Sequence, residues 1–368
     1  MCRLATVVTA SASALALTAC GVIDGIGGSD SSASPEKGDD ITVGLLLPDK
    51  DTARFENFDY PVIKKEVATL TQGKGNVVYA NAEASQDKQS RQFQQMVDQK
   101  VDVILVDALD AKAIAPDVRK AKDAGIPVIA YDRLAQGPID AYVSHDNELV
   151  GEVQARAISD ALGSNAASSK IVMMNGDPAD TNYAKYKQGA LKEFGNKVRI
   201  VKKYDTDKWS PAVAKANMKK AIQAVGVDNI AAVYAANDGL AGAVIEALKE
   251  AGATRIPPVT GQDANLDAVQ RIVSGEQYMT VYKPFLEEAT RAAEMAVYMV
   301  QGHHIQFEAL TRDAVDSPTE KKIPSMLVSA VALTKDNIKE TVIADGVYSV
   351  KDICTPKYAA DCAAIGLK

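Results

Sequence analysis

Residues 101–133 read VDVILVDALDAKAIAPDVRKAKDAGIPVIAYDR, and this stretch decides the fold class. Two short, nearly continuous apolar runs, 101–106 and 127–131, flank a helical stretch over 111–124 that ends at Gly125. Apolar runs without alternation are typical of strands that are buried on both faces. A helix between two such strands predicts a parallel strand–helix–strand unit.

Strand and helix alternate in the same way along most of the chain. Further strands are expected at 41–47, 76–79, 170–174, 198–201, 230–234 and 258–260. Further helices are expected at 56–70, 87–99, 179–194, 211–224, 239–251, 265–274 and 285–300. This alternation predicts an α/β protein whose parallel sheets are covered by helices on both faces. One (β/α)8 barrel would also fit the periodicity, and we favour two lobes, each with a doubly wound parallel sheet.

The N-terminal residues have the pattern of a signal peptide. Arg3 precedes an apolar segment over 4–17, and the segment closes in Leu17-Thr18-Ala19-Cys20. An apolar run of roughly 14 residues is too short to span a bilayer. A small pair directly before a cysteine is typical of a bacterial lipobox. We therefore expect a signal peptide over 1–19, lipidation of Cys20 and a flexible Gly/Ser-rich tether over 20–40; a plain cleaved signal is the alternative.

Composition describes a globular protein. The chain has 368 residues, 47% hydrophobic and 24% charged, with a formal net charge of −7 and no basic stripe, so nucleic acid is not an expected partner. Cys354 and Cys362 are expected to form a local disulfide that staples a C-terminal tail over 351–368. A metal pair is disfavoured because none of the three histidines is spaced against these cysteines.

Polar and aromatic side chains follow the predicted strands, where ligands bind in open parallel sheets. They are Asp49, Arg54, Phe55, Asp132, Arg133, Asp180, Asn182, Asp205, Trp209, Asn237, Asp238, Gln262, Asp263 and Lys283. Charged planar groups suit a neutral sugar, because each hydroxyl both donates and accepts hydrogen bonds. The apolar faces of a pyranose pack on aromatic rings such as Trp209 and Phe55.

Structural explanations compete for several of these residues. Asp180, Asp238 and Asp263 could be helix N-caps, Asp132-Arg133 a surface ion pair, and Trp209 part of the core. Their joint occurrence after successive strands favours a binding site.

The sequence contains none of the common catalytic motifs: no Gly-x-Ser-x-Gly, His-Glu-x-x-His, P-loop or Gly-x-Gly-x-x-Gly after a strand. We therefore expect no enzyme, no cofactor and no metal site. Paired carboxylates could in principle hydrolyse a glycoside, so a secreted sugar-active hydrolase on a barrel remains the enzyme alternative.

Six motifs, taken together in this order, resemble the xylose-binding proteins of bacterial ABC importers. They are Asp132-Arg133, Asp180-x-Asn182, Trp209, Asn237-Asp238, Gly261-Gln-Asp263 and Met279-Thr-Val-Tyr-Lys283-Pro284. The resemblance runs from Ile41 to about Tyr348 and implies the periplasmic binding protein type I fold. It implies a hinge of three chain crossings near Asp146, Lys283 and Leu333. The implied lobes are 41–146 plus 284–330, and 147–283 plus 331–350.

The resemblance also implies a set of sugar contacts. They are Arg54, Phe55, Asp132, Arg133, Asp180, Asn182, Trp209, Asn237, Asp263 and Lys283. The chain departs from the family pattern in having Phe55 where the family has Trp, Pro48-Asp49-Lys50-Asp51 in place of an acidic pair, and a tail with Cys354 and Cys362.

These features predict a monomeric, lipid-anchored receptor that lies outside the cell membrane. It would capture a monosaccharide, for which D-xylose is the first candidate, and deliver it to the permease of an ABC importer. A receptor that signals through a membrane partner would use the same site.

Overall fold

The computed structural model describes residues 37–52 and 54–368. The expected signal peptide, the lipidation site Cys20 and most of the expected tether lie outside the described residues. No helix in the described part of the chain is long and apolar enough to cross a membrane.

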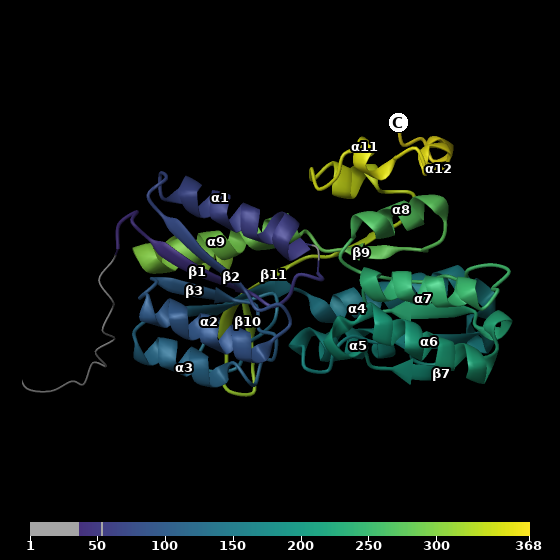
Figure 1. The fold of residues 1–368 in the computed structure, drawn as a ribbon, viewed down its shortest axis with the longest axis horizontal. Coiled ribbons are helices and arrows are strands. Elements are labelled where there is room, and N and C mark those ends of the chain that lie inside the picture. Colours follow the sequence, from purple (N-terminus) through teal and green to yellow (C-terminus); the bar gives the residue numbers. More distant parts are fainter. Residues whose placement is uncertain (1–36, 53) are drawn as a thin grey trace, which may run out of the picture. The chain divides into compact units, whose positions relative to one another are not determined.

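The first lobe contains a seven-stranded sheet (Figure 1). Its order is β10 (Asp313–Val315), β11 (Ile323–Val328), β5 (Ala141–His145), β4 (Val128–Tyr131), β3 (Val103–Val106), β1 (Thr42–Leu47) and β2 (Asn76–Asn81). Every neighbouring pair is parallel except β10 with β11. The apolar runs of β1, β3 and β4 are buried, as their lack of alternation predicts.

Helices cover both faces of this sheet. The helices α1 (Tyr60–Leu70) and α9 (Phe285–Gln301) pack on one face, where Ile63 and Ala293 meet Leu45. The helices α2 (Gln86–Asp98) and α3 (Ala115–Asp123) pack on the other, where Phe93 and Val118 meet Val106. The short helix α10 (His304–Leu310) follows α9. The side chains therefore form two apolar layers, one on each side of the strands.

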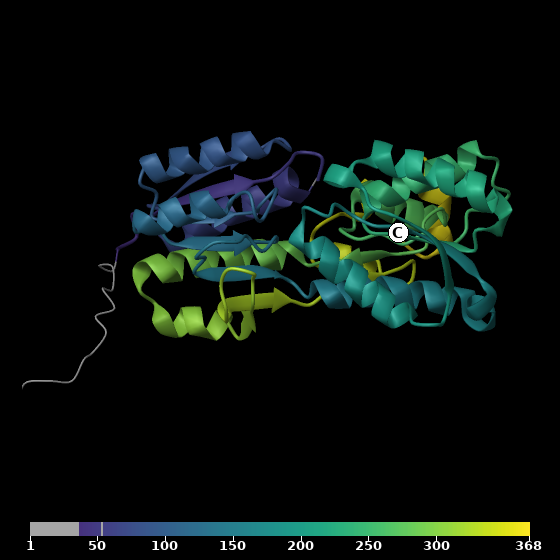
Figure 2. The same ribbon diagram turned by 90° about the horizontal axis from the view of Figure 1, so that it is seen from below.

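The second lobe contains a three-stranded parallel sheet, in the order β7 (Arg199–Tyr204), β6 (Lys170–Met174), β8 (Ala232–Ala235). Four helices pack on it, as Figures 1 and 2 show: α4 (Asn147–Leu162), α5 (Thr181–Phe194), α6 (Pro211–Val225) and α7 (Asp238–Glu250). The strand expected at 258–260 is wrong; only one bridge joins Val259 to Val233. Pro257 and Pro258 lack the amide hydrogens that a ladder needs. Two separate sheets exclude the barrel.

Close backbone contact fixes where α5 lies. A Cβ on Gly189 of α5 would lie 1.9 Å from the carbonyl oxygen of Glu148 in α4, and a Cβ on Gly151 would lie 2.0 Å from the carbonyl oxygen of Tyr186. Only glycine fits at these two contacts, so the helices approach more closely than other residues would permit. The N-terminus of α5, which carries Asp180, is positioned by this packing.

The chain crosses between the lobes at three places. It leaves the seven-stranded sheet after His145, returns at Lys283-Pro284 before α9, and leaves again after Val328. The strands β9 (Thr280–Tyr282) and β12 (Val331–Leu333) pair antiparallel beside the second and third crossings. The last crossing therefore precedes Leu333 by a few residues.

The C-terminal residues pack on α8 (Leu266–Ser274) of the second lobe. They include α11 (Val350–Ile353) and α12 (Ala359–Ala364), and Cys354 is joined to Cys362 by a disulfide. Phe58 of the first lobe reaches this segment, with its ring 6.0 Å from that of Tyr348. The described residues also include short helical turns: η1 (Phe55–Asp59), η2 (Gly163–Ser168), η3 (Asp207–Trp209), η4 (Val227–Asn229) and η5 (Lys339–Ile343).

Candidate functional site

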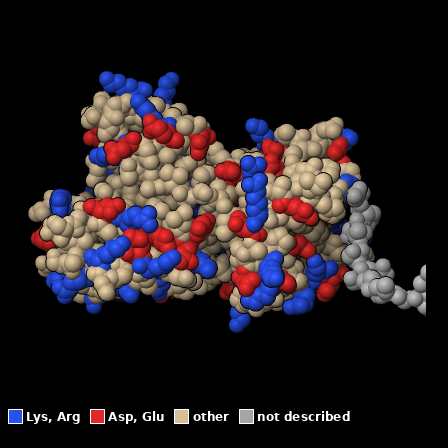
Figure 3. Space-filling view, turned by 180° about the vertical axis from the view of Figure 1, so that it is seen from behind, with Lys and Arg blue, Asp and Glu red and all other residues tan. Residues whose placement is uncertain are grey.

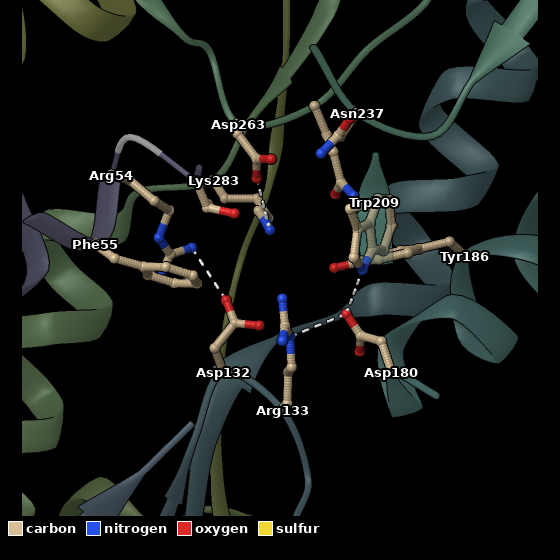
Figure 4. Close-up of a pocket in the computed structure, with 12 residues that line it drawn as sticks. Arg54, Phe55, Asp132, Arg133, Asp180, Tyr186, Trp209, Asn237, Asp263 and Lys283 are labelled. Carbon is tan, nitrogen blue, oxygen red and sulfur yellow. Dashed lines mark hydrogen bonds and ion pairs between the residues drawn. The ribbon is translucent and has the colours of Figure 1, made fainter. Parts of the chain in front are cut away.

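A cavity lies between the lobes, at the carboxyl ends of strands from both sheets (Figure 4). It encloses about 340 Å³, counted with the space at its open side. Its walls are Thr52, Arg54, Phe55, Asp132, Arg133, Asp180, Tyr186, Trp209, Asn237, Gln262, Asp263 and Lys283. Nine of the ten sugar contacts expected from the sequence line it, and Asn182 does not.

Asp180 and Asn237 each cap the N-terminus of a helix and also line the cavity. Asp180 caps α5, because its Oδ1 accepts a hydrogen bond of 2.8 Å from the amide of Asn182. Asn237 caps α7 in the same way, at 2.9 Å from the amide of Leu240. The second polar atom is Nδ2 in Asn237, and in Asp180 it is Oδ2, which pairs with Arg133 and Trp209 at the cavity wall. The cap therefore orients the group that faces the cavity.

Arg133 and Asp180 join the two lobes across the cavity. The Nε of Arg133 lies 3.0 Å from the Oδ2 of Asp180, and the Nε1 of Trp209 donates to the same oxygen at 3.0 Å. The carboxylate of Asp107 lies behind Arg133 at 3.5 Å from Nε and is fully buried. An arginine fork between carboxylates is a rigid donor array, and it leaves guanidinium hydrogens for a ligand.

Arg54 organises the first-lobe wall of the cavity. Its guanidinium contacts Asp59 at 2.9 Å, Asp132 at 3.1 Å and Glu288 at 2.5 Å. The contact with Asp132 is made by the buried Nη1 of Arg54. Asn182 acts from behind this wall, since its Nδ2 donates to Oδ1 of Asp132 at 2.8 Å. Asn182 thus orients Asp132 across the lobe boundary.

Aromatic rings and one lysine complete the second-lobe wall. The indole of Trp209 lies over Gly176, where a Cβ would meet its ring at 2.1 Å. The ring of Tyr186 meets Trp209 edge-on, with centroids 6.3 Å apart. The Nζ of Lys283 lies 2.9 Å from Oδ1 of Asp263. Flat apolar surface and paired charges therefore alternate around the cavity (Figure 4).

Three residues of the cavity wall have left-handed backbone conformations. The φ angles are 56° at Asp132, 54° at Trp209 and 92° at Asp263. Such angles are uncommon outside glycine and persist only where surrounding contacts hold them. Three of the ten non-glycine residues with positive φ in the described part of the chain line this one cavity, which supports it as the candidate site.

Burial shifts the pKa values of the charged groups beneath the cavity. Burial raises the pKa of Glu288 to about 8 and that of Asp59 to about 6, although Arg54 opposes both shifts. Burial and the neighbouring cations hold the pKa of His145 well below its usual range. Ligand atoms of Asp132, His145 and Glu288 lie within 4.8 Å of one another, close enough to hold a metal ion. The guanidinium of Arg54 already pairs with both carboxylates there.

Comparison with known proteins identifies the family. A family model described as the periplasmic binding protein domain matches residues 43–304. The D-xylose-binding periplasmic protein of Escherichia coli (strain K12) is 32% identical over 320 residues, which cover 85% of this chain and 93% of that protein. The chain belongs to the periplasmic binding protein family.

Two further relatives support this membership and the fold type. The multiple sugar-binding periplasmic receptor ChvE of Rhizobium radiobacter is 30% identical over 337 residues, covering 85% of this chain and 92% of its own. A crystal structure of an ABC transporter solute binding protein from Clostridium phytofermentans with bound β-D-glucose matches with a TM-score of 0.77 and 25% identity. It covers 85% of this chain and 99% of that chain. The protein has the type I fold of its family.

Three residues of this periplasmic binding protein's cavity wall are absent from the predicted contacts. Thr52 and Tyr186 lie on a loop and within a helix, so an inspection of strand ends does not single them out. Tyr186 is one helical turn after Asn182, and that spacing is the signal that could have found it. Gln262 follows a predicted strand, and its Oε1 is buried without a partner.

Proposed function

We propose that this protein is an extracytoplasmic receptor that captures a monosaccharide, most readily D-xylose, between its lobes and delivers it to the permease of an ABC importer. One observation carries the proposal. The cluster of the buried Arg133 and Asp180 with the partly buried Trp209 combines an arginine fork, a carboxylate and a flat indole, and its members come from both lobes. This is the chemistry that the alternating donors, acceptors and apolar faces of a pyranose require.

The names of the relatives support a sugar as the ligand and point to monosaccharides. The names of two relatives specify D-xylose or several sugars, and a structural neighbour holds β-D-glucose. Because a bound sugar would contact both lobes, its binding would favour the closed form that a permease can recognise. The charged groups on the face seen in Figure 3 are of both signs and intermixed. This distribution fits recognition by shape and local pairing more than a long-range field.

Calorimetry on the purified residues 37–368 tests the proposal. Titration with xylose, arabinose, ribose, glucose and galactose should give saturable heat with at least one aldose, and xylose should bind most tightly. A matching rise in the unfolding temperature is expected, because a ligand that binds only the folded state stabilises it. No heat and no thermal shift with any of the five sugars would refute sugar binding.

We propose further that Cys20 carries the lipid that anchors this receptor to the membrane. The sequence around residues 17–20 supports this. Expression of the full chain with an alkyne-bearing fatty acid should label the wild type, and Cys20→Ala should abolish the label and release the protein from the membrane fraction. Equal labelling of the wild type and Cys20→Ala would refute lipidation at Cys20.

A further inference from the structure

Asp238 is fully buried beside the cavity and does not line it. It is the first residue of α7, next to the cap Asn237. Its carboxylate accepts three hydrogen bonds: from Nε2 of Gln277 at 2.7 Å, from the amide of Asn265 at 2.9 Å and from Oγ1 of Thr280 at 2.9 Å. A helix cap needs one acceptor, and Asn237 already provides it. The three bonds of Asp238 therefore serve another purpose.

Two of the three partners connect Asp238 to the loop that carries Asp263. Asn265 is part of that loop, and Thr280 also accepts a hydrogen bond of 3.3 Å from the amide of Ala264. Within the loop φ is 92° at Asp263 and 50° at Ala264. These conformations are uncommon for side-chain-bearing residues and need surrounding contacts to hold them. The bonds to Asp238 supply such contacts on the C-terminal side of Asp263.

The N-terminal side of the loop packs closely against the carboxylate of Asp238. A Cβ on Gly261 would lie 2.0 Å from Oδ1 of Asp238 and 2.7 Å from Nε2 of Gln277. The amide of Asp238 also donates to the carbonyl oxygen of Gln262 at 3.1 Å. The loop is therefore held against Asp238 at both ends, with Gln262 and Asp263 between them.

We propose that Asp238 is a positioning residue for sugar recognition: it fixes the 261–265 loop so that Asp263 and Gln262 face the cavity. This inference rests on the proposed function. Asp263 then meets Lys283 at 2.9 Å, where the chain crosses between the lobes. A shift of the loop would move this pair and the buried Oε1 of Gln262 together, so several contacts to a sugar would weaken at once.

The charge state of Asp238 makes the role testable by pH. Burial raises its pKa to about 8, with Asp263 acting in the same direction and Arg271 of α8 acting against it. Asp238 in turn raises the pKa of Tyr348 in the C-terminal segment. Protonation of Asp238 removes the negative charge that strengthens all three bonds and places a proton beside the N–H donors of Asn265 and Gln277, so it loosens the loop. Sugar affinity in the wild type should therefore rise as the pH increases through about 8.

The experiment compares Asp238→Asn, Thr280→Val and the double variant by calorimetry with xylose. Asp238→Asn keeps the shape but places an amide N–H against Gln277 or Asn265, so the dissociation constant should increase about tenfold or more. Thr280→Val removes one of the bonds, and the double variant should lose less than the product of the two effects, because both act through one loop. Glu246→Gln, on the exposed side of the same helix, should bind as the wild type does.

The pH profile separates positioning from a general loss of folding. The rise in affinity through pH 8 should be present in the wild type and in Glu246→Gln and absent from Asp238→Asn. Unchanged affinity and an unchanged pH profile in Asp238→Asn would overturn the inference while leaving sugar binding intact. Absence of xylose binding by the wild type, with another aldose bound, moves the test to that aldose, and the same outcomes then decide it. Absence of binding to every aldose refutes the proposed function itself.

Discussion

Replacement of Arg133 by methionine removes the cation that joins the lobes. Methionine has a similar length and no charge, so the change leaves Asp107 and Asp180 buried without the guanidinium that now lies 3.5 and 3.0 Å from them. Neither oxygen of Asp107 has a hydrogen-bond partner besides this ion pair. The variant therefore isolates the cost of uncompensated buried carboxylates at the cavity.

The burial of these groups sets the expected loss of stability and of sugar affinity in Arg133→Met. Removing one partner of a buried ion pair costs about 3–5 kcal/mol of folding free energy. A hydrogen bond from a charged group is worth about 1.5–3 kcal/mol, so the loss of Arg133 as a sugar donor should weaken binding about ten- to 150-fold. Burial already raises the pKa of Asp107 and Asp180. In the variant both carboxylates can relieve the cost by taking up protons, so the loss of stability should be smaller at pH 5 than at pH 8.

Urea denaturation and xylose calorimetry, each at pH 5, 7 and 8, measure these effects. Arg133→Lys keeps the charge but loses the planar fork, and should fall between methionine and the wild type. Arg156→Met removes an exposed arginine that lies 3.5 Å from Glu193, and should change stability by about 0.5 kcal/mol or less. If Arg133→Met binds xylose within twofold of the wild type and unfolds at the same urea concentration, Arg133 does not hold the lobes or the sugar as we describe.

Three more predictions concern the indole, a buried acid and the tail. Gly176→Ala would place a Cβ 2.1 Å from the ring of Trp209, so it should shift the tryptophan emission and weaken sugar binding, whereas Gly239→Ala, with ordinary contacts beyond 3.5 Å, should do neither. Because the pKa of Glu288 rises from 4.5 to about 8 on folding, the folded state holds a proton that the unfolded chain releases, and this contribution to stability is lost as the pH rises through that window. Glu288→Gln should therefore gain stability relative to the wild type between pH 5 and 8 in urea titrations, while the exposed Glu287→Gln keeps the wild-type slope. The Cys354–Cys362 bridge closes a loop with a sequence separation of 8, which corresponds to about 2–3 kcal/mol of unfolded-state constraint. Reduction of this disulfide should speed proteolysis within 350–368 and leave xylose affinity unchanged. Equal proteolysis rates for the reduced and the oxidised protein would contradict this.

The strands and the approximate place of the site could be predicted because they depend on local pattern. Buried parallel strands need continuous apolar runs, and these are visible at 41–47 and 101–106. The carboxyl ends of parallel strands gather at one edge, so residues that follow them, such as Asp132 and Asn237, meet at the cavity. The strand expected at 258–260 did not form because Pro258 and the preceding Pro257 lack the amide donors that pairing requires.

The pairing of those residues was decided by the tertiary structure alone. Glu288 meets Arg54 across 234 residues of sequence, and Asn182 holds Asp132 without lining the cavity itself. The sequence by itself determined which residue types follow each strand, because the apolar runs locate the strands and the residues after them can be read directly. The sequence placed Asp107 and Asp238 directly after strands, but it did not show that Asp107 contacts Arg133 or that Asp238 holds the loop of Asp263. Those contacts depend on how separate segments pack, and packing leaves no period in the sequence.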